Sequence, residues 1–456
     1  MNKKSFRAAM LRGLGRCYTE LRDCADPEPY RGVVLWGCTH LISFDTQSEG
    51  ARSAYLYRLI GCFPDPGFFI DRIAAAYETV SGRDTWFFLH LTELLCFAAS
   101  DGSQTAQAAL SGKYDKLHAA LLARRRFGSG YDFKRDDFEN LTVCLLNAGT
   151  VVPPRRMVAD YGYLITHNKH YDLRWFDWFI FRLEETVGQK KLTAWLKKYA
   201  DDPSVGAFYR AYLAYREEVE NERAARRAPP PVPTAEELRT AVEAGEEVSP
   251  AKRAAFGRRG GVEEKKKLAD AIESEPDSRK KAALLGALRL DDYPGDHARL
   301  AAYASSDCAE LADAAREVLT YCRSEAAYRY AKQALERDMS DETAVEILLM
   351  NYRPADKELL LCALNGLKID YACTSGWHGA VSQIVCAQDR GVKLPRDFFM
   401  FVYEKSLCSY CRESAVRYMG RRRWLTPDMI AECLYDSNDD IAAYAEKIEK
   451  RRDGKA

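Results

Sequence analysis

The stretch SSDCAELADAAREVL, residues 305–319, decides the fold that we predict for this chain. A polar turn of serine, aspartate and cysteine leads directly into an alanine-rich run. The apolar residues after this turn follow the i, i+4, i+7, i+8, i+11 spacing of one helix face: Leu311, Ala315, Val318, Leu319 and Cys322. The pattern therefore predicts an amphipathic helix that buries one face and begins at a polar turn.

The same turn and helix recur in the second half of the chain. They appear as EPDSRKKAALLGAL (275–288), MSDETAVEILL (339–349), CSYCRESAVRYMG (408–420) and YDSNDDIAAYAEKI (435–448). Asp277, Asp307 and Asp341 are 30 and 34 residues apart, and Cys408 follows after a further 67. A period of about 30–40 residues with two helices per unit predicts an all-α fold, an α-solenoid of stacked helical hairpins.

In these turns and helices the chain resembles the HEAT-like, armadillo-type helical repeat superfamily over about residues 262–450. The resemblance is carried best by SDCAELADAAREVL (306–319) and CRESAVRYMG (411–420), and more weakly by DTQSEGARSAYLYRLI (45–60) in the first half. It implies a curved array of helices with a binding surface. It does not imply an enzyme.

A proline-rich stretch, RRAPPPVPTAEEL from residue 226, divides the chain. Proline fixes φ and removes the amide donor, so no helix runs through four prolines within five residues. We expect an N-terminal helical domain over 1–225 with divergent repeats, a linker over 226–260, a C-terminal HEAT-like domain over 261–450 and a disordered tail over 451–456.

Composition narrows the class of protein. Lys plus Arg and Asp plus Glu both number 67, so the chain lacks the overall basic excess of a dedicated nucleic-acid binder. No apolar stretch approaches the roughly 20 residues that cross a bilayer, and no secretory signal opens the chain. The 14 cysteines fit reduced, buried thiols, so we expect a cytoplasmic protein without a membrane partner.

The segment DTQSEG, residues 45–50, combines acidic and hydroxyl side chains just before an aromatic helix. Thr46 and Glu49 have the spacing of a capping box, in which each side chain bonds the backbone amide of the other residue. A reactive cluster is the alternative, but no nucleophile is singled out near it. We interpret the segment as the start of a helix.

The most unusual segment is HNKHYDLRWFDWFIFRLEE, residues 167–185. Its aromatic residues fit either a core seam or an exposed interface, where tryptophan is favoured. The candidates for partner binding here are Trp175, Trp178 and Phe179. His167 and His170 lie three residues apart, but zinc needs three or four convergent ligands, so we predict no metal site.

A second candidate surface is GRRRW, with Arg421, Arg422, Arg423 and Trp424. Arginines hold phosphates and tryptophan stacks on bases, although charge runs on helices are usually solvated faces. Other basic runs lie at 124–126, 252–259 and 265–267. The CSYC motif at Cys408 and Cys411 is a lone CxxC, which we interpret as two structural thiols rather than a zinc site.

The sequence favours a non-enzymatic scaffold or adaptor that binds another protein or peptide through a concave or aromatic surface, with no cofactor. Phosphate-loop, HExxH, GxSxG and complete GxGxxG motifs are missing, so we assign no catalytic residue, although enzymatic activity stays open. The alternative is a nucleic-acid-binding protein that resembles the HEAT-like DNA alkylation-repair type. For that alternative the residues to test are Trp175, Asp177, Trp178 and Trp424.

Overall fold

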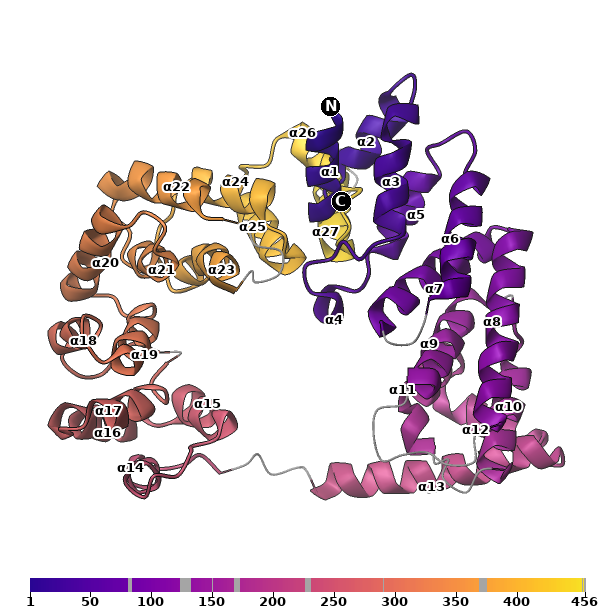
Figure 1. Cartoon of the computed structure of the whole chain (residues 1–456), viewed down its shortest axis with the longest axis horizontal. Helices are drawn as coiled ribbons and strands as arrows, with labels where there is room; N and C mark the ends of the chain where they lie inside the picture. Colours follow the sequence, from indigo (N-terminus) through magenta and orange to yellow (C-terminus); the bar gives the residue numbers. More distant parts are fainter. Residues whose placement is uncertain are drawn as a thin grey trace. The chain divides into compact units, whose positions relative to one another are not determined.

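The structure, a computed structural model, describes the chain apart from residues 81–83, 124–132, 150, 168–172, 226–230, 290, 369–374, 453, 455 and 456. The described residues form 27 α-helices and three short 3-10 helices, and no strand occurs among them (Figure 1). The predicted all-α class is confirmed. Within the same residues, no helix combines the length and the apolar character needed to cross a bilayer.

The helices gather into two compact units. The first unit holds residues 1–228, 407–410 and 425–456, and the second holds residues 229–406 and 411–424. The boundary after residue 228 falls in the proline-rich stretch that the sequence marked. The C-terminal boundary differs from the predicted domain of 261–450, because residues 425–456 pack with the first unit.

The first unit is a succession of helices in which each packs on near neighbours in the sequence, as α5 on α7, α7 on α9 and α10 on α13. Its elements are α1 (Lys3–Arg12), α2 (Arg16–Asp23), η1 (Glu28–Tyr30), α3 (Arg31–Cys38), α4 (Thr46–Glu49), α5 (Ser53–Ile60), α6 (Gly67–Thr79), α7 (Thr85–Ser100), α8 (Gln104–Leu122), α9 (Phe133–Ala148), α10 (Pro154–His167), η2 (Leu173–Phe176), α11 (Asp177–Val187), α12 (Gln189–Lys198), α13 (Pro203–Ala225), α26 (Pro427–Cys433) and α27 (Asp439–Arg452).

In the second unit, helix pairs stack one on the next (Figure 1). Successive second helices of these pairs pack in a row, α17 on α19, α19 on α21 and α21 on α23. The elements are α14 (Ala235–Glu243), α15 (Pro250–Arg259), α16 (Val262–Ser274), α17 (Ser278–Leu285), α18 (His297–Tyr303), α19 (Ala309–Leu319), α20 (Glu325–Arg337), α21 (Glu342–Met350), η3 (Pro354–Asp356), α22 (Lys357–Gly366), α23 (Ser375–Asp389), α24 (Arg396–Lys405) and α25 (Ser409–Arg421). This packing is compatible with a helical repeat fold.

The recurring turns start helices as the sequence predicted. The Asp277 carboxylate accepts the backbone N–H groups of Arg279 and Lys280, and the Asp341 carboxylate accepts that of Ala344. In the turn at 305–308 the N-cap is Cys308 rather than Asp307. Asp341 also pairs with Arg316 from α19, so the cap of one helix is linked to the preceding helix of the row.

The predicted linker at 226–260 is too long. Residues 235–259 form α14 and α15, and α14 begins with a capping box in which Thr234 and Glu237 bond each other's backbone amides. Leu238, Val242 and Phe256 are buried, so both helices belong to the packed second unit. The predicted tail at 451–456 begins as helix, since α27 continues to Arg452.

The end of the chain packs against its beginning inside the first unit. The backbone N–H of Ser437 donates to the carbonyl oxygen of Gly13 at 2.8 Å, and Arg16 pairs with Glu432 at 2.7 Å. The rings of Tyr18 and Tyr435 stack with centroids 4.3 Å apart. Residues 425–456 are therefore structural partners of α1 and α2, which no local sequence pattern reveals.

Gly162 allows α10 and α13 to approach closely. A Cβ at this position would lie 1.8 Å from the carbonyl oxygen of Ser204, which is far inside van der Waals contact. The next ring along, Tyr161, is fully buried and packs against the rings of Phe176 and Phe179. The small residue and the aromatic cluster together fix the core that supports α11.

Candidate functional site

Helix α11 carries the most exposed large aromatic side chain among the described residues. Trp178 is 61% exposed and Phe181 is 48% exposed, and their rings meet edge to face with centroids 6.0 Å apart. Phe179, by contrast, is fully buried, so the prediction that it binds a partner is corrected: its ring belongs to the core. The side chain of Trp175 lies outside the described residues.

The start of α11 is held by a carboxylate from another helix. Glu139 of α9 is buried, and its Oε1 accepts the backbone N–H groups of Trp178 at 3.0 Å and Phe179 at 3.3 Å. Burial raises the pKa of Glu139 to about 8, although these two hydrogen bonds and the helix dipole favour its charged form. A side chain of α9 therefore holds the backbone of α11 in place at Trp178.

We expect this carboxyl group to make stability fall as pH rises from about 4.5 to 8. The folded state binds the proton more tightly than the unfolded state, so stability decreases by up to about 1.4 kcal/mol per pH unit over that range. Glu139→Gln keeps an acceptor for both amides and removes the charge, and it should flatten this dependence. Urea unfolding of both proteins from pH 5 to 9 measures it. An unchanged slope in the variant would contradict the assignment.

The arginine cluster predicted from GRRRW lies at the C-terminal end of α25. Arg421, Arg422 and Arg423 are all exposed, and the structure gives none of them an ion pair with a described carboxylate. Arg422 lies over the ring of Tyr418, 5.5 Å from its centroid. Their charges complement the negative end of the helix dipole, which is a structural role that needs no ligand.

Trp424 packs beside this cluster rather than standing free. Its ring centroid lies 5.7 Å from that of Tyr418 and 6.1 Å from that of Phe399. The Trp424 backbone N–H donates to the carbonyl oxygen of Met419 at 2.8 Å. The tryptophan therefore closes the end of α25, with part of its ring left accessible.

The segment 45–52 begins a helix, but one residue earlier than predicted. Asp45 is the N-cap of α4, and its carboxylate accepts the backbone N–H of Gln47 at 3.1 Å. The predicted capping box of Thr46 and Glu49 is not formed, because α4 ends after one turn and α5 starts afresh at Ser53. Glu49 is directed to other partners instead.

Glu49 and Arg52 form a buried ion pair, with each side chain 1% exposed. Arg52 also donates to the carbonyl oxygens of Leu11 and Leu407, both at 2.8 Å. Glu49 accepts the backbone N–H of Ser409 at 2.8 Å. Two charged side chains thus hold the turn at 407–409, in which the CSYC motif begins.

A cavity of about 360 Å³ opens beside this pair in the first unit. Its lining is charged and polar as well as aromatic, and includes Glu49, Arg52, Arg58, Glu93, Phe97 and Asp436. Burial raises the pKa of Glu93. A cavity of this size and polarity suits a small polar molecule, but none of the partner-binding residues chosen from the sequence lines it.

Ser53, which lines this cavity, contacts a buried histidine. The Ser53 hydroxyl lies 3.1 Å from Nδ1 of His90, whose Nε2 lies 3.0 Å from the carbonyl oxygen of Cys38 and donates to it. Both side chains are buried, and burial lowers the pKa of His90 to about 4. Because the third group is the backbone carbonyl of Cys38 and not a carboxylate, we interpret the pair as a link between α3, α5 and α7 rather than a nucleophile and base.

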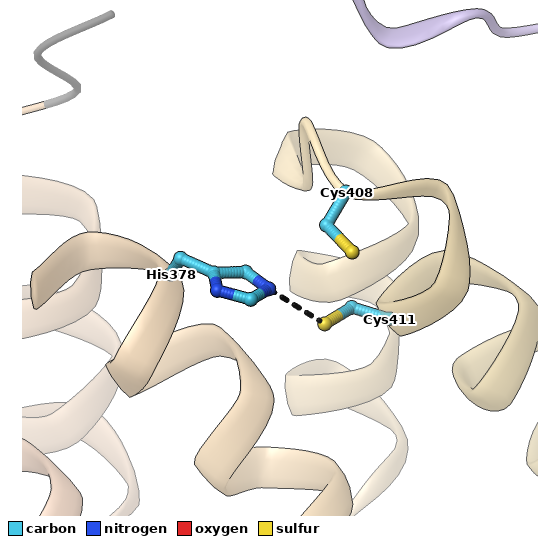
Figure 2. A group of neighbouring side chains, drawn as sticks. All are labelled: His378, Cys408 and Cys411. Carbon is cyan, nitrogen blue, oxygen red and sulfur yellow. Dashed lines mark hydrogen bonds between the residues drawn. The ribbon is translucent and has the colours of Figure 1, made fainter. Parts of the chain in front are cut away.

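The CSYC motif gains a third side chain that sequence spacing did not reveal. Figure 2 shows the imidazole of His378, from α23, directed toward the thiols of Cys408 and Cys411 at the start of α25. Sγ of Cys411 lies 3.4 Å from Nε2 of His378, and the three potential ligand atoms all lie within 4.8 Å of one another. Both cysteines are buried and His378 is half-buried.

The other pair of potential metal ligands considered from the sequence, His167 and His170, lies only partly within the described residues. His167 stacks on Tyr163, and its Nδ1 lies 2.9 Å from the carbonyl oxygen of that residue. His170 and the basic run at 124–126 fall outside the described residues. In the run at 265–267, Lys265 pairs with Asp291 and Lys267 with Glu264, both at 2.7 Å, which fits an ordinary solvated or packed face.

Comparison with known proteins gives no family. No family model matches the chain, and no curated protein matches it. Among solved structures the chain aligns with an engineered protein from the Northeast Structural Genomics Consortium, at 14% identity over 96% of this chain and 98% of that one, with a TM-score of 0.19. A TM-score at this level supports no argument about fold or function.

Proposed function

We propose that the chain is a non-enzymatic HEAT-like scaffold that binds another protein. The row of α17, α19, α21 and α23 supports the repeat assignment, as does the pairing of Arg316 with the Asp341 cap of the next helix in the row. In repeat arrays each hairpin depends on its neighbours for burial, and the outer helix faces stay free for ligands. The proposal needs no reacting side chain.

The observation that carries the proposal is the exposed aromatic pair on α11. Trp178 and Phe181 place two large rings on the surface, while Phe179 on the opposite side of the helix anchors it in the core. Tryptophan is strongly enriched among the residues that dominate protein interfaces. Two exposed rings on one helix are better explained by contact with a partner than by permanent exposure to water.

The partner that fits is an amphipathic helix with basic residues beside its apolar face. Asp177 and Glu185 are exposed and flank the two rings along α11. Arg182 pairs with Glu185 at 2.7 Å and satisfies part of that charge. The carboxylates would meet basic side chains of the partner, while Trp178 and Phe181 would take its apolar face.

Replacing both rings, Trp178→Ala with Phe181→Ala, is expected to weaken partner binding by about 30-fold or more, since central aromatic residues contribute about 2 kcal/mol or more. Tagged protein captured from native lysate, followed by binding of the purified partner, measures the change. The matched control is Trp86→Ala, which removes another exposed tryptophan from the same unit. A partner retained equally by the double variant would overturn the proposal for this surface.

Nucleic acid is the second candidate, favoured by the three exposed arginines at 421–423. In that case the captured material disappears after nuclease treatment. Replacement of all three arginines by alanine would then reduce the slope of log affinity against log salt by about 2.7, because each phosphate contact contributes about 0.9. An unchanged slope would remove this cluster from the nucleic-acid proposal.

A further inference from the structure

We propose that His378, Cys408 and Cys411 bind one Zn²⁺ ion. The cluster combines two thiols and one imidazole, ligands that suit zinc and other soft or borderline metals and do not suit Mg²⁺ or Ca²⁺. Zinc at about 2.3 Å from sulfur and about 2.0 Å from nitrogen separates tetrahedral ligands by about 3.5–3.8 Å. The 3.4 Å between Cys411 Sγ and His378 Nε2 is close to that separation.

One contact joins the imidazole to a thiol, and the chain itself joins the two thiols. His378 and Cys411 belong to the same unit, and α23, which carries His378, packs on α21. Cys408 is joined to Cys411 by the first turn of α25, so their spacing follows from the helix itself. Small side-chain rotations are enough to bring the three atoms onto one ion.

Within the first unit, contacts brace residues 407–410, where the motif begins. Glu49 accepts the Ser409 N–H, Arg52 donates to the Leu407 carbonyl, and the Tyr410 hydroxyl donates to the carbonyl oxygen of Ser48 at 2.5 Å. Bracing of this kind holds ligands in place before the metal arrives. The segment 45–52 therefore positions the motif, in addition to starting α4 and α5.

Metal binding forms two zinc–sulfur bonds and one zinc–nitrogen bond, and the two thiol protons pass to solvent. Three protein ligands leave one of zinc's four positions for an exchangeable ligand. Because protons are released, affinity rises with pH through the thiol range.

A second group of potential ligands offers a contrast within the described residues. Asp292, His297 and Cys322 also lie within 4.8 Å of one another. There the imidazole Nε2 lies 2.7 Å from the carbonyl oxygen of Tyr293, and the Cys322 thiol donates to the carbonyl oxygen of Val318 at 3.4 Å. In this second group the side chains come from a carboxylate, an imidazole and a single thiol, which is a poorer donor set for zinc, so the group serves as the internal control.

The test is titration of the reduced, chelator-treated full chain with Co²⁺, followed by displacement with Zn²⁺. The wild type is expected to bind one Co²⁺ with thiolate-to-cobalt charge-transfer absorption. Cys408→Ser and Cys411→Ser should lose that absorption, and His378→Asn should weaken binding by about 100-fold or more, since even outer-shell changes cost about 10–100-fold. Circular dichroism confirms that each variant is folded, and His378→Asn keeps the test valid if a serine variant unfolds.

The controls are Cys386→Ser, which removes an exposed thiol from the same helix as His378, and His297→Asn in the second group. Both should bind Co²⁺ as the wild type does. The proposal is overturned if the wild type shows no thiolate-to-cobalt absorption, if His378→Asn binds with unchanged affinity, or if His297→Asn alone abolishes binding.

Discussion

Replacing Arg52 by methionine is expected to lower the free energy of unfolding of the first unit by about 3–5 kcal/mol, the usual effect of removing one partner from a buried ion pair. The Glu49 carboxylate would remain buried without its guanidinium, because both side chains are 1% exposed. The carbonyl oxygens of Leu11 and Leu407 would lose the same donor group. Each of these losses leaves a buried oxygen atom without the guanidinium N–H group that it bonds in the wild type.

Chemical denaturation followed by circular dichroism and tryptophan fluorescence measures this loss. The matched control is Lys116→Met, which breaks a pair with Glu78 whose side chains are 65% and 47% exposed, and which should change stability by no more than about 1 kcal/mol. A second change, Glu49→Gln in the Arg52→Met background, should recover part of the loss by removing the stranded charge. Equal effects of the buried and the exposed replacement would contradict the argument.

The second large effect is expected at Gly162. Gly162→Ala places a methyl group 1.8 Å from the carbonyl oxygen of Ser204, and a backbone atom cannot rotate away as a flexible side chain can. The helices α10 and α13 must separate, so we expect a loss of about 3 kcal/mol, the upper end of the usual range for overpacking, or more. Thermal unfolding of the full chain should show the change as a lower Tm.

Gly112 on α8 provides the control for this substitution. A Cβ at position 112 meets no atom within 4 Å, so Gly112→Ala should stabilise the chain by about 0.5–1 kcal/mol through helix propensity. The two alanine variants are thus expected to differ in sign. If both destabilise the chain to the same extent, close packing at Gly162 is not the cause.

Local features of the fold were predictable because they depend on neighbouring residues. The caps at Asp277 and Asp341 and the helix over residues 309–319 follow from turn chemistry and apolar spacing. The cap at Asp45 instead of Thr46 is a local error of one residue, since an aspartate and a threonine compete for the same role. Helices α14 and α15 were assigned to the linker because they are short, and because the prolines and charged residues around them leave few apolar positions from which to recognise a helix.

The candidate surfaces were harder to predict, because exposure depends on the direction in which a helix packs. Trp178 and Phe179 are adjacent in the sequence, yet one is exposed and the other fully buried. The His378 ligand was missed because 33 residues separate it from Cys411, and no spacing rule joins them. The contact between His378 of α23 and Cys411 of α25 exists only in the folded chain, and the sequence pattern does not contain it.

The pairing of α2 with α26 has a consequence for biosynthesis. Arg16 and Glu432 are 416 residues apart, so at about 5–20 residues per second the first helices wait roughly 20–80 s for their partner to be translated. During that time the nascent chain presents the α1 and α2 surfaces that residues 425–456 later cover. Residues 229–406 are released earlier, so much of the second unit is available to fold before the first can be completed. The unit that contains the beginning of the chain is therefore the last to be completed on the ribosome.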